Sequence, residues 1–229
     1  MTSTPRLSYR EEDGARLGAL EWELGPGWRA ISSAVLGGGI GPCSWVLNAQ
    51  VVAGYSRMDP VEHLRELGPA GDGVGMMTAA SVDRYVVARD GGAEACATVG
   101  LRVPTWAAAP EGVPDPELAP IRVGTVNILV RVPVAMTDGA LVNTVMTVTE
   151  AKTQALLEAG FEGTGTASDA VCVAVRAEGA EELFGGPRST WGARVARAVH
   201  AAVLQGAEDW AAAHAAGGPF TAGARTRAR

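Results

Sequence analysis

Residues 147–175, TVTEAKTQALLEAGFEGTGTASDAVCVAV, carry the chain from a helix into a strand. Up to Gly160 the apolar residues recur at helical spacings, as in a helix with one buried face. Residues 169–175 form an apolar run of strand length. Between them, residues 163–169 (GTGTASD) are too small and polar for a core and too short for a linker. The stretch therefore predicts a helix and a buried strand with a functional site at their junction.

The helix that ends at Gly160 is expected to begin at Asp138, a residue type favoured at N-caps. Lys152 lies in the middle of its apolar face. Because an unpaired buried ammonium would lose its proton, Lys152 should extend to solvent, pair with a carboxylate, or serve a site. Glu150 projects about 200° away around the helix, either into solvent or into a site of its own. The apolar face consists of Leu141, Val145, Val148, Ala155, Leu156 and Ala159.

The first half of the chain contains short strand-like runs separated by glycine, proline or aspartate. A short helix at residues 60–67, after an Asp59 cap, interrupts them. Five prolines make residues 104–120 irregular, and residues 121–132 then form another strand. A last helix should start near Ser189 or Thr190. The earlier strand-like runs are residues 16–24, 28–35, 44–52, 74–80, 83–88 and 95–101.

This order of elements, strands early and long helices late, favours an α+β or mixed α/β layered fold over alternating βαβ units. The chain has 229 residues, of which 47% are hydrophobic and 19% charged, so it can bury a substantial core. We expect a single domain over residues 1–220. Residues 221–229, which end in RTRAR, should form a flexible basic tail.

Charge and cysteine usage exclude several classes of protein. A net charge of −6 argues against a nucleic-acid surface, because phosphate neutralisation needs clustered Lys and Arg. Cys43, Cys96 and Cys172 form neither a disulfide framework nor a CxxC motif, and the three histidines are scattered, so no metal or other cofactor is predicted. No apolar leader and no run of about 18 apolar residues is present. We expect a cytoplasmic protein without nucleic-acid or membrane partners; a homo-oligomer is left open.

Candidate binding residues gather in polar or glycine-rich segments. Residues 32–39 match neither the P-loop nor the dinucleotide-binding pattern, so they form either a plain turn or a backbone cradle for a ligand. Residues 163–169 supply hydroxyl groups beside two glycines, and Asn127 interrupts an apolar strand and needs partners if buried. The candidate substrate-binding residues are Ser32, Ser33, Gly38, Gly39, Asn48, Thr78, Thr125, Asn127, Thr164, Thr166 and Ser168.

In this order, the segments SSAVLGGG, MTAA, ATVGL, GTVNILV, TEAKTQAL, GTGTASDAV and GPRSTWGARVARAV resemble the adenosylcobinamide amidohydrolases, the CbiZ family. The similarity spans residues 28–204, and TEAK..AL followed by TGT..SDAV is its most specific part. The resemblance implies a corrinoid substrate. It also implies hydrolysis of the amide between a cobyric acid propionate and aminopropanol, in corrinoid salvage for cobamide (vitamin B12) synthesis. Departures at Gly37, Ala167 and near Val103 bear on the substrate more than on the reaction.

Amide hydrolysis needs an activated nucleophile, a donor for the oxyanion and a proton for the leaving amine. The histidines and cysteines stand in structural contexts, which leaves carboxylates, Lys152 and hydroxyls. Asp169 or Glu150 is predicted to be the general base for water, with Lys152 as its partner or as the oxyanion stabiliser. A second hypothesis makes Thr149 a nucleophile activated by Lys152. Two other functions stay open: a corrinoid-binding protein without catalysis, and an amidohydrolase for another bulky amide.

Overall fold

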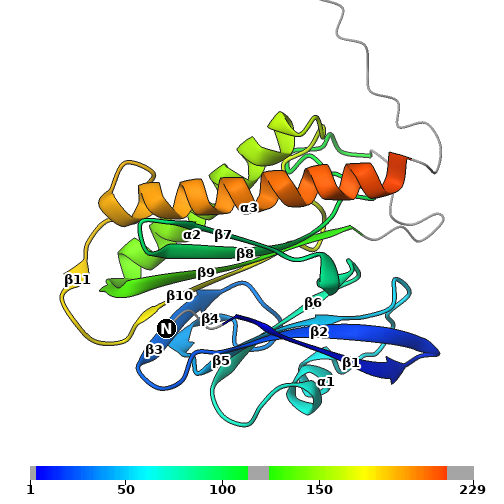
Figure 1. The fold of residues 1–229 in the computed structure, drawn as a ribbon, viewed down its shortest axis with the longest axis horizontal. Coiled ribbons are helices and arrows are strands. Elements are labelled where there is room, and N and C mark those ends of the chain that lie inside the picture. Colours follow the sequence, from blue (N-terminus) through cyan, green and yellow to red (C-terminus); the bar gives the residue numbers. More distant parts are fainter. Residues whose placement is uncertain (1–3, 113–123, 216–229) are drawn as a thin grey trace, which may run out of the picture.

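The computed structural model describes residues 4–112 and 124–215, which form two packed β-sheets flanked by helices (Figure 1). The long helices α2 (Asp138–Glu158) and α3 (Thr190–His214) cover the outer face of one sheet. The short helix α1 (Pro60–Leu67) lies on the outer face of the other. The order of layers is therefore helices, sheet, sheet and helix.

The first sheet has the strand order β1-β2-β5-β6. Its pairs are antiparallel except for β5 and β6, which are parallel and joined by the crossover helix α1. The strands are β1 (Arg6–Glu12), β2 (Ala15–Glu23), β5 (Trp45–Gln50) and β6 (Gly73–Thr78).

The second sheet has the order β4-β3-β10-β9-β8-β7, and the short strand β11 also pairs with β9. Within that order only β9 and β10 are parallel, and α2 is the crossover between them. A 3₁₀ helix, η1 (Val82–Arg84), precedes β7. The strands are β3 (Trp28–Ser32), β4 (Gly39–Pro42), β7 (Val86–Asp90), β8 (Ala93–Gly100), β9 (Thr125–Met136), β10 (Ala170–Arg176) and β11 (Glu181–Glu182).

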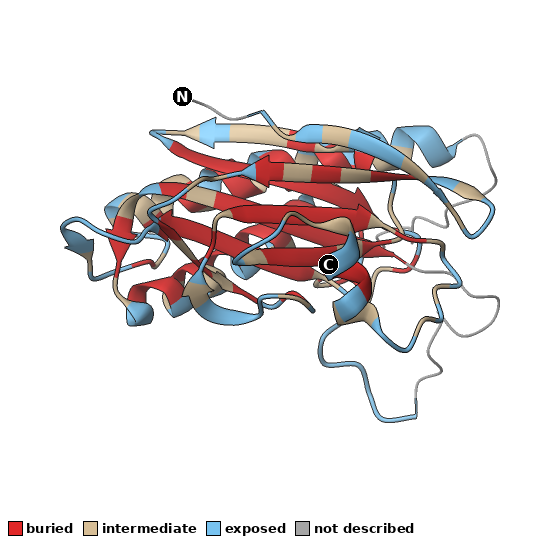
Figure 2. Ribbon diagram, turned by 90° about the horizontal axis from the view of Figure 1, so that it is seen from below, coloured by how far each residue is buried: buried red, intermediate tan, exposed pale blue. Residues whose placement is uncertain are grey.

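Strand β10 shows why its sequence is apolar throughout. Val171, Val173 and Val175 pack in the core beneath α2 and α3, whereas Cys172 and Ala174 pack in the core between the sheets. Successive side chains of a strand point to opposite faces, so a strand covered on both sides needs apolar residues at every position. Figure 2 shows that the central strands are buried along most of their length.

Helix α2 is closed at both ends by backbone and side-chain contacts. Thr137 is its N-cap and accepts a hydrogen bond from Ala140 N at 3.2 Å, so the predicted cap at Asp138 is wrong by one residue. Gly160 has a φ of +86°, and Phe161 N donates to Leu156 O at 3.0 Å. This is the glycine-closed C-terminus expected from the sequence. Because the chain reverses at Gly160, the following loop returns along the helix toward Lys152.

The predicted mixed α/β fold, with strands mostly early and long helices late, is confirmed. The last helix begins at Thr190 behind the Ser189 cap, as predicted. The run at residues 83–88 becomes a strand only from Val86, because η1 occupies its first positions. The predicted tail at residues 221–229, and part of the irregular region at residues 104–120, lie outside the described residues.

No helix in the described part of the chain is long and apolar enough to cross a membrane.

Candidate active site

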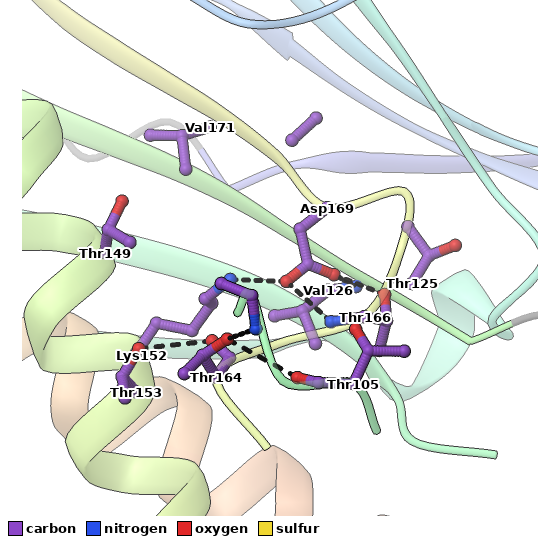
Figure 3. A network of polar contacts seen from close by, with 12 residues as sticks. Thr105, Thr125, Val126, Thr149, Lys152, Thr153, Thr164, Thr166, Asp169 and Val171 are labelled. Carbon is purple, nitrogen blue, oxygen red and sulfur yellow. Dashed lines mark hydrogen bonds and ion pairs between the residues drawn. The ribbon is translucent and has the colours of Figure 1, made fainter. Parts of the chain in front are cut away.

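The predicted junction between α2 and β10 contains a buried ion pair. Lys152, from α2, contacts the carboxylate of Asp169, which immediately precedes β10 (Figure 3). The two side chains are only 9% and 10% exposed. Lys152 therefore pairs with a carboxylate and does not extend to solvent, and a role in a site is compatible with this pairing.

Asp169 accepts hydrogen bonds from four donors. Oδ1 accepts from Val126 N at 2.8 Å and from the hydroxyl of Thr166. Oδ2 accepts from Thr166 N at 3.1 Å and from the Lys152 ammonium. A carboxylate has about four acceptor positions, so each is in use. Asp169 thus joins α2, the start of β9 and its own loop, and a water molecule can reach it only by displacing one of these donors.

Thr164 is held on two sides by protein groups. Thr164 N donates to Thr105 O at 2.8 Å, and the Thr164 hydroxyl accepts from Ala107 N at 2.9 Å. On the other side, the Thr153 hydroxyl of α2 donates to Thr164 O at 3.1 Å. The loop is therefore fixed between residues 105–107 and the helix (Figure 3).

The two glycines of this loop allow close packing of the protein on itself. A Cβ atom at Gly165 would lie closer than 3.0 Å to both Asp169 Oδ2 and Lys152 Nζ. A Cβ atom at Gly163 would lie 2.9 Å from Thr105 O. Gly165 is thus required for the ion pair to occupy its place, a role that the sequence pattern did not reveal.

Ser168 presents a hydroxyl group at the surface, next to Asp169. It is exposed, and its Oγ lies 2.9 Å from the hydroxyl of the buried Thr125. Ser168 Oγ also donates to Gly124 O at 3.2 Å, so the hydroxyl of Thr125 is the donor between the two. One lone pair of Ser168 Oγ is left for a ligand.

Residues 32–39, which are far from residues 163–171 in the sequence, contact them in the structure. Ser33 N donates to Val171 O at 3.0 Å, and Ser33 Oγ accepts from Val171 N at 3.1 Å. The hydroxyl of Ser32 donates to the same carbonyl at 3.0 Å. Gly38 and Gly39 follow on the exposed side. Two predicted segments therefore meet where β3 ends and β10 begins.

Asn127 finds the partners that its burial requires. Its Nδ2 donates to Asn48 Oδ1 at 2.9 Å and to Met77 O at 2.8 Å, and its Oδ1 accepts from Ala170 N at 3.1 Å. Asn48 in turn donates to the Thr98 hydroxyl at 2.9 Å. This network ties the two sheets together directly below the junction. Thr78, another predicted binding residue, is buried and accepts from Ala80 N at 3.0 Å.

Replacing Asn127 by leucine should lower the free energy of unfolding by about 3 kcal/mol, because it leaves buried donor and acceptor groups without partners. Urea unfolding followed by circular dichroism measures the change. Asn143→Leu, at a half-buried position on α2, is the control and should shift stability by less than about 1 kcal/mol. Equal stability losses in the two variants would contradict a special role of the network.

Glu150 and Thr149 do not join the ion pair. Glu150 is exposed and lines a separate groove of about 410 Å³ between α2 and α3, with Arg197 and His200. The Thr149 hydroxyl donates within the helix to Val145 O at 3.0 Å and lies away from the Lys152 ammonium (Figure 3). The geometry therefore favours Asp169 over Glu150 and gives no support to a Thr149 nucleophile.

The histidines have structural partners, as the sequence suggested. His63 is buried between Glu12, at 2.8 Å, and the Tyr55 hydroxyl, at 3.0 Å. His200 contacts Glu158 at 2.7 Å, and His214 Nδ1 donates to Trp210 O, also at 2.7 Å.

The cysteines and the potential metal ligands give no second candidate site in the part of the chain that the structure describes. Cys43, Cys96 and Cys172 are buried free thiols, and burial raises the pKa of Cys96. Among residues 4–112 and 124–215, no group of three or more His, Cys, Asp or Glu side chains is placed to hold a metal ion.

The fold and this polar sheet edge define a mixed α/β protein with a candidate hydrolytic site of lysine, carboxylate and hydroxyl groups. Residues 4–215 match the model of the adenosylcobinamide amidohydrolase family, CbiZ, and the chain belongs to this family. The family membership predicted from the sequence motifs is thereby confirmed.

Two relatives that bear the family's name support the same assignment. The chain is 30% identical to the adenosylcobinamide amidohydrolase of Methanosarcina mazei over 152 residues, which cover 64% of this chain and 69% of that protein. It is 36% identical to the protein of the same name from Halobacterium salinarum over 139 residues, 59% of this chain and 58% of that protein. An uncharacterized protein of Methanocaldococcus jannaschii is 33% identical over 91 residues, or 36% of this chain and 35% of that protein.

Proposed function

We propose that this chain hydrolyses the amide bond that joins aminopropanol to the corrinoid of adenosylcobinamide. The products are adenosylcobyric acid and aminopropanol, and the acid re-enters cobamide synthesis in corrinoid salvage. The match of residues 4–215 to the amidohydrolase family carries the proposal. We assign the reaction to the polar edge around Asp169, where Lys152, a carboxylate and hydroxyl groups lie together.

The substrate would lie across the edge where β3 ends and β9 and β10 begin. Ser33, Gly38, Gly39 and Ser168 are exposed there and offer hydroxyl and backbone groups to the amide side chains of a corrinoid. A macrocycle is too broad for a closed cavity, so an open edge suits it. The other proposed binding residues, which lie at or below this edge, are Ser32, Asn48, Thr78, Thr125, Asn127, Thr164 and Thr166.

Asp169 is our candidate general base. Of its four donors the Thr166 hydroxyl is neutral and can rotate, so a water molecule can take its place beside Oδ1. Asp169 would accept a proton as the water oxygen attacks the amide carbon, and would return it to the leaving amine as the C–N bond breaks. Lys152 would stay beside Oδ2 and offset the charge of the oxyanion.

A corrinoid-binding protein without catalysis is the second candidate. The observation that favours it is the full set of donors on Asp169, which suits a structural role. The exposed edge would then bind the corrinoid without hydrolysing it.

One experiment separates these functions. The purified, metal-stripped protein is incubated with adenosylcobinamide, and adenosylcobyric acid and aminopropanol are followed by mass spectrometry. Product formation establishes the amidohydrolase. If no product forms with or without added Mg²⁺ or Zn²⁺ while corrinoid stays on the protein, the binding function is correct. Other bulky amides in the same assay test for a different substrate.

Glu150→Gln should change kcat/KM by no more than about twofold, since substitutions at exposed positions away from a site have small effects. The same assay measures this, with Asp169→Asn beside it. A loss of a hundredfold or more in Glu150→Gln would instead assign the general base to the groove between α2 and α3.

A further inference from the structure

Apart from the candidate active site, the protein has a cavity of about 290 Å³ that is lined by polar and charged residues among others. Its walls come from η1, the ends of β6 and β8, and the last turns of α3. Arg84 of η1 and Arg102, just after β8, line it, as do Asp209 and Trp210 of α3. The volume is at the lower end of the range for ligand pockets, about 300–1,000 Å³, so it suits a small group.

The two arginines of this cavity are unusual in the molecule. Across residues 4–112 and 124–215, only Arg84, Arg102 and Arg188 lack an ion pair, a hydrogen bond and an aromatic contact. Arg84 and Arg102 line the same cavity, and both are exposed. In a chain of net charge −6, where most arginines have partners, two free guanidinium groups around one hollow indicate an anionic ligand.

We propose that this cavity binds a phosphate group through Arg84 and Arg102. A guanidinium group presents a planar set of N–H donors that matches the oxygens of a phosphate. The two positive charges exceed the single negative charge of Asp209, which also lines the cavity. Ala79 and Ala80 also line the cavity, and their small side chains occupy little of its space.

The cavity adjoins the proposed active site. Gly100 lines the cavity and pairs with Thr125, whose hydroxyl contacts Ser168. The phosphate therefore belongs either to a substrate whose amino alcohol is phosphorylated or to a free phosphate ester. Only the first of these sources rests on the proposed function.

Binding is tested without turnover. Inorganic phosphate is titrated into the full chain at low ionic strength and followed by ³¹P NMR. We expect saturable binding that is weakened about tenfold by Arg84→Gln and by Arg102→Gln, because each removes a charge-assisted contact. Arg188→Gln, at the third free arginine, is the matched control and should bind like the wild type. Asp209→Asn should tighten binding a few-fold.

Two outcomes would overturn the site. One is the absence of saturable phosphate binding by the wild type. The other is an equal loss of phosphate binding in Arg188→Gln.

A second arm identifies the source of the phosphate. The KM values for adenosylcobinamide and adenosylcobinamide phosphate are compared in wild type and Arg84→Gln. A KM that rises only for the phosphorylated substrate assigns the cavity to the substrate. If Arg84→Gln has the same KM values as the wild type for both compounds but still binds inorganic phosphate more weakly, the cavity is assigned to a free ester. If neither compound is hydrolysed, the proposed function fails while the ³¹P titration still decides the cavity.

Discussion

Lys152→Met should lower the free energy of unfolding by about 3 kcal/mol, because it leaves the buried Asp169 carboxylate without its counter-charge. Turnover should fall at least a hundredfold, since the variant loses the charge that we propose offsets the oxyanion. Urea unfolding and the adenosylcobinamide assay measure the two effects. The exposed pair of Arg197 and Asp90 is the matched control, and Arg197→Met should cost less than about 1 kcal/mol.

The double variant Lys152→Met/Asp169→Asn separates folding from chemistry. Removing both charges should recover part of the stability but none of the turnover. Asp169→Asn alone should abolish turnover and leave corrinoid binding intact. Near-normal turnover in Asp169→Asn would remove this residue from the mechanism, and wild-type stability of Lys152→Met would show that the pair is screened by solvent.

Gly165→Ala should reduce turnover by about a hundredfold, because the new Cβ atom would push Asp169 and Lys152 apart and small displacements of reacting groups are costly. The overpacking should also cost about 1–3 kcal/mol of stability. Gly139→Ala in the first turn of α2 is the control, since no heavy atom lies within 4 Å of its Cβ position. It should stabilise the protein slightly. Gly165→Ala with normal kinetics would mean that the loop adapts.

Elements with strong local patterns were predictable from the sequence. The α2 helix follows from its apolar spacing and from Gly160, but Thr137 and Asp138 are both good N-caps and only the backbone geometry distinguishes them. Strand β1 was missed because its sequence, RLSYREE, is mostly polar and lies at the edge of the first sheet. Strand β4, GIGP, was missed because glycine and proline usually indicate a turn.

The candidate site was predictable in composition but not in geometry. The sequence limited Lys152 to a few roles, yet its pairing with Asp169 depends on the reversal of the chain at Gly160. The contact between Ser33 and Val171 joins residues 138 positions apart, which no local pattern reports. Glu150 and Asp169 were both candidate general bases, and only the folded structure shows that Asp169 is the carboxylate in contact with Lys152.

The burial of β10 on both faces has a consequence for the dynamics of the candidate site. Amide groups in such a central strand exchange with solvent only when most of the structure opens. Asp169 and the Ser33–Val171 contact lie at the beginning of this strand. We therefore expect the proposed site residues to be anchored to a slowly exchanging strand, so that local fluctuation of the surrounding loops leaves their positions unchanged between turnovers.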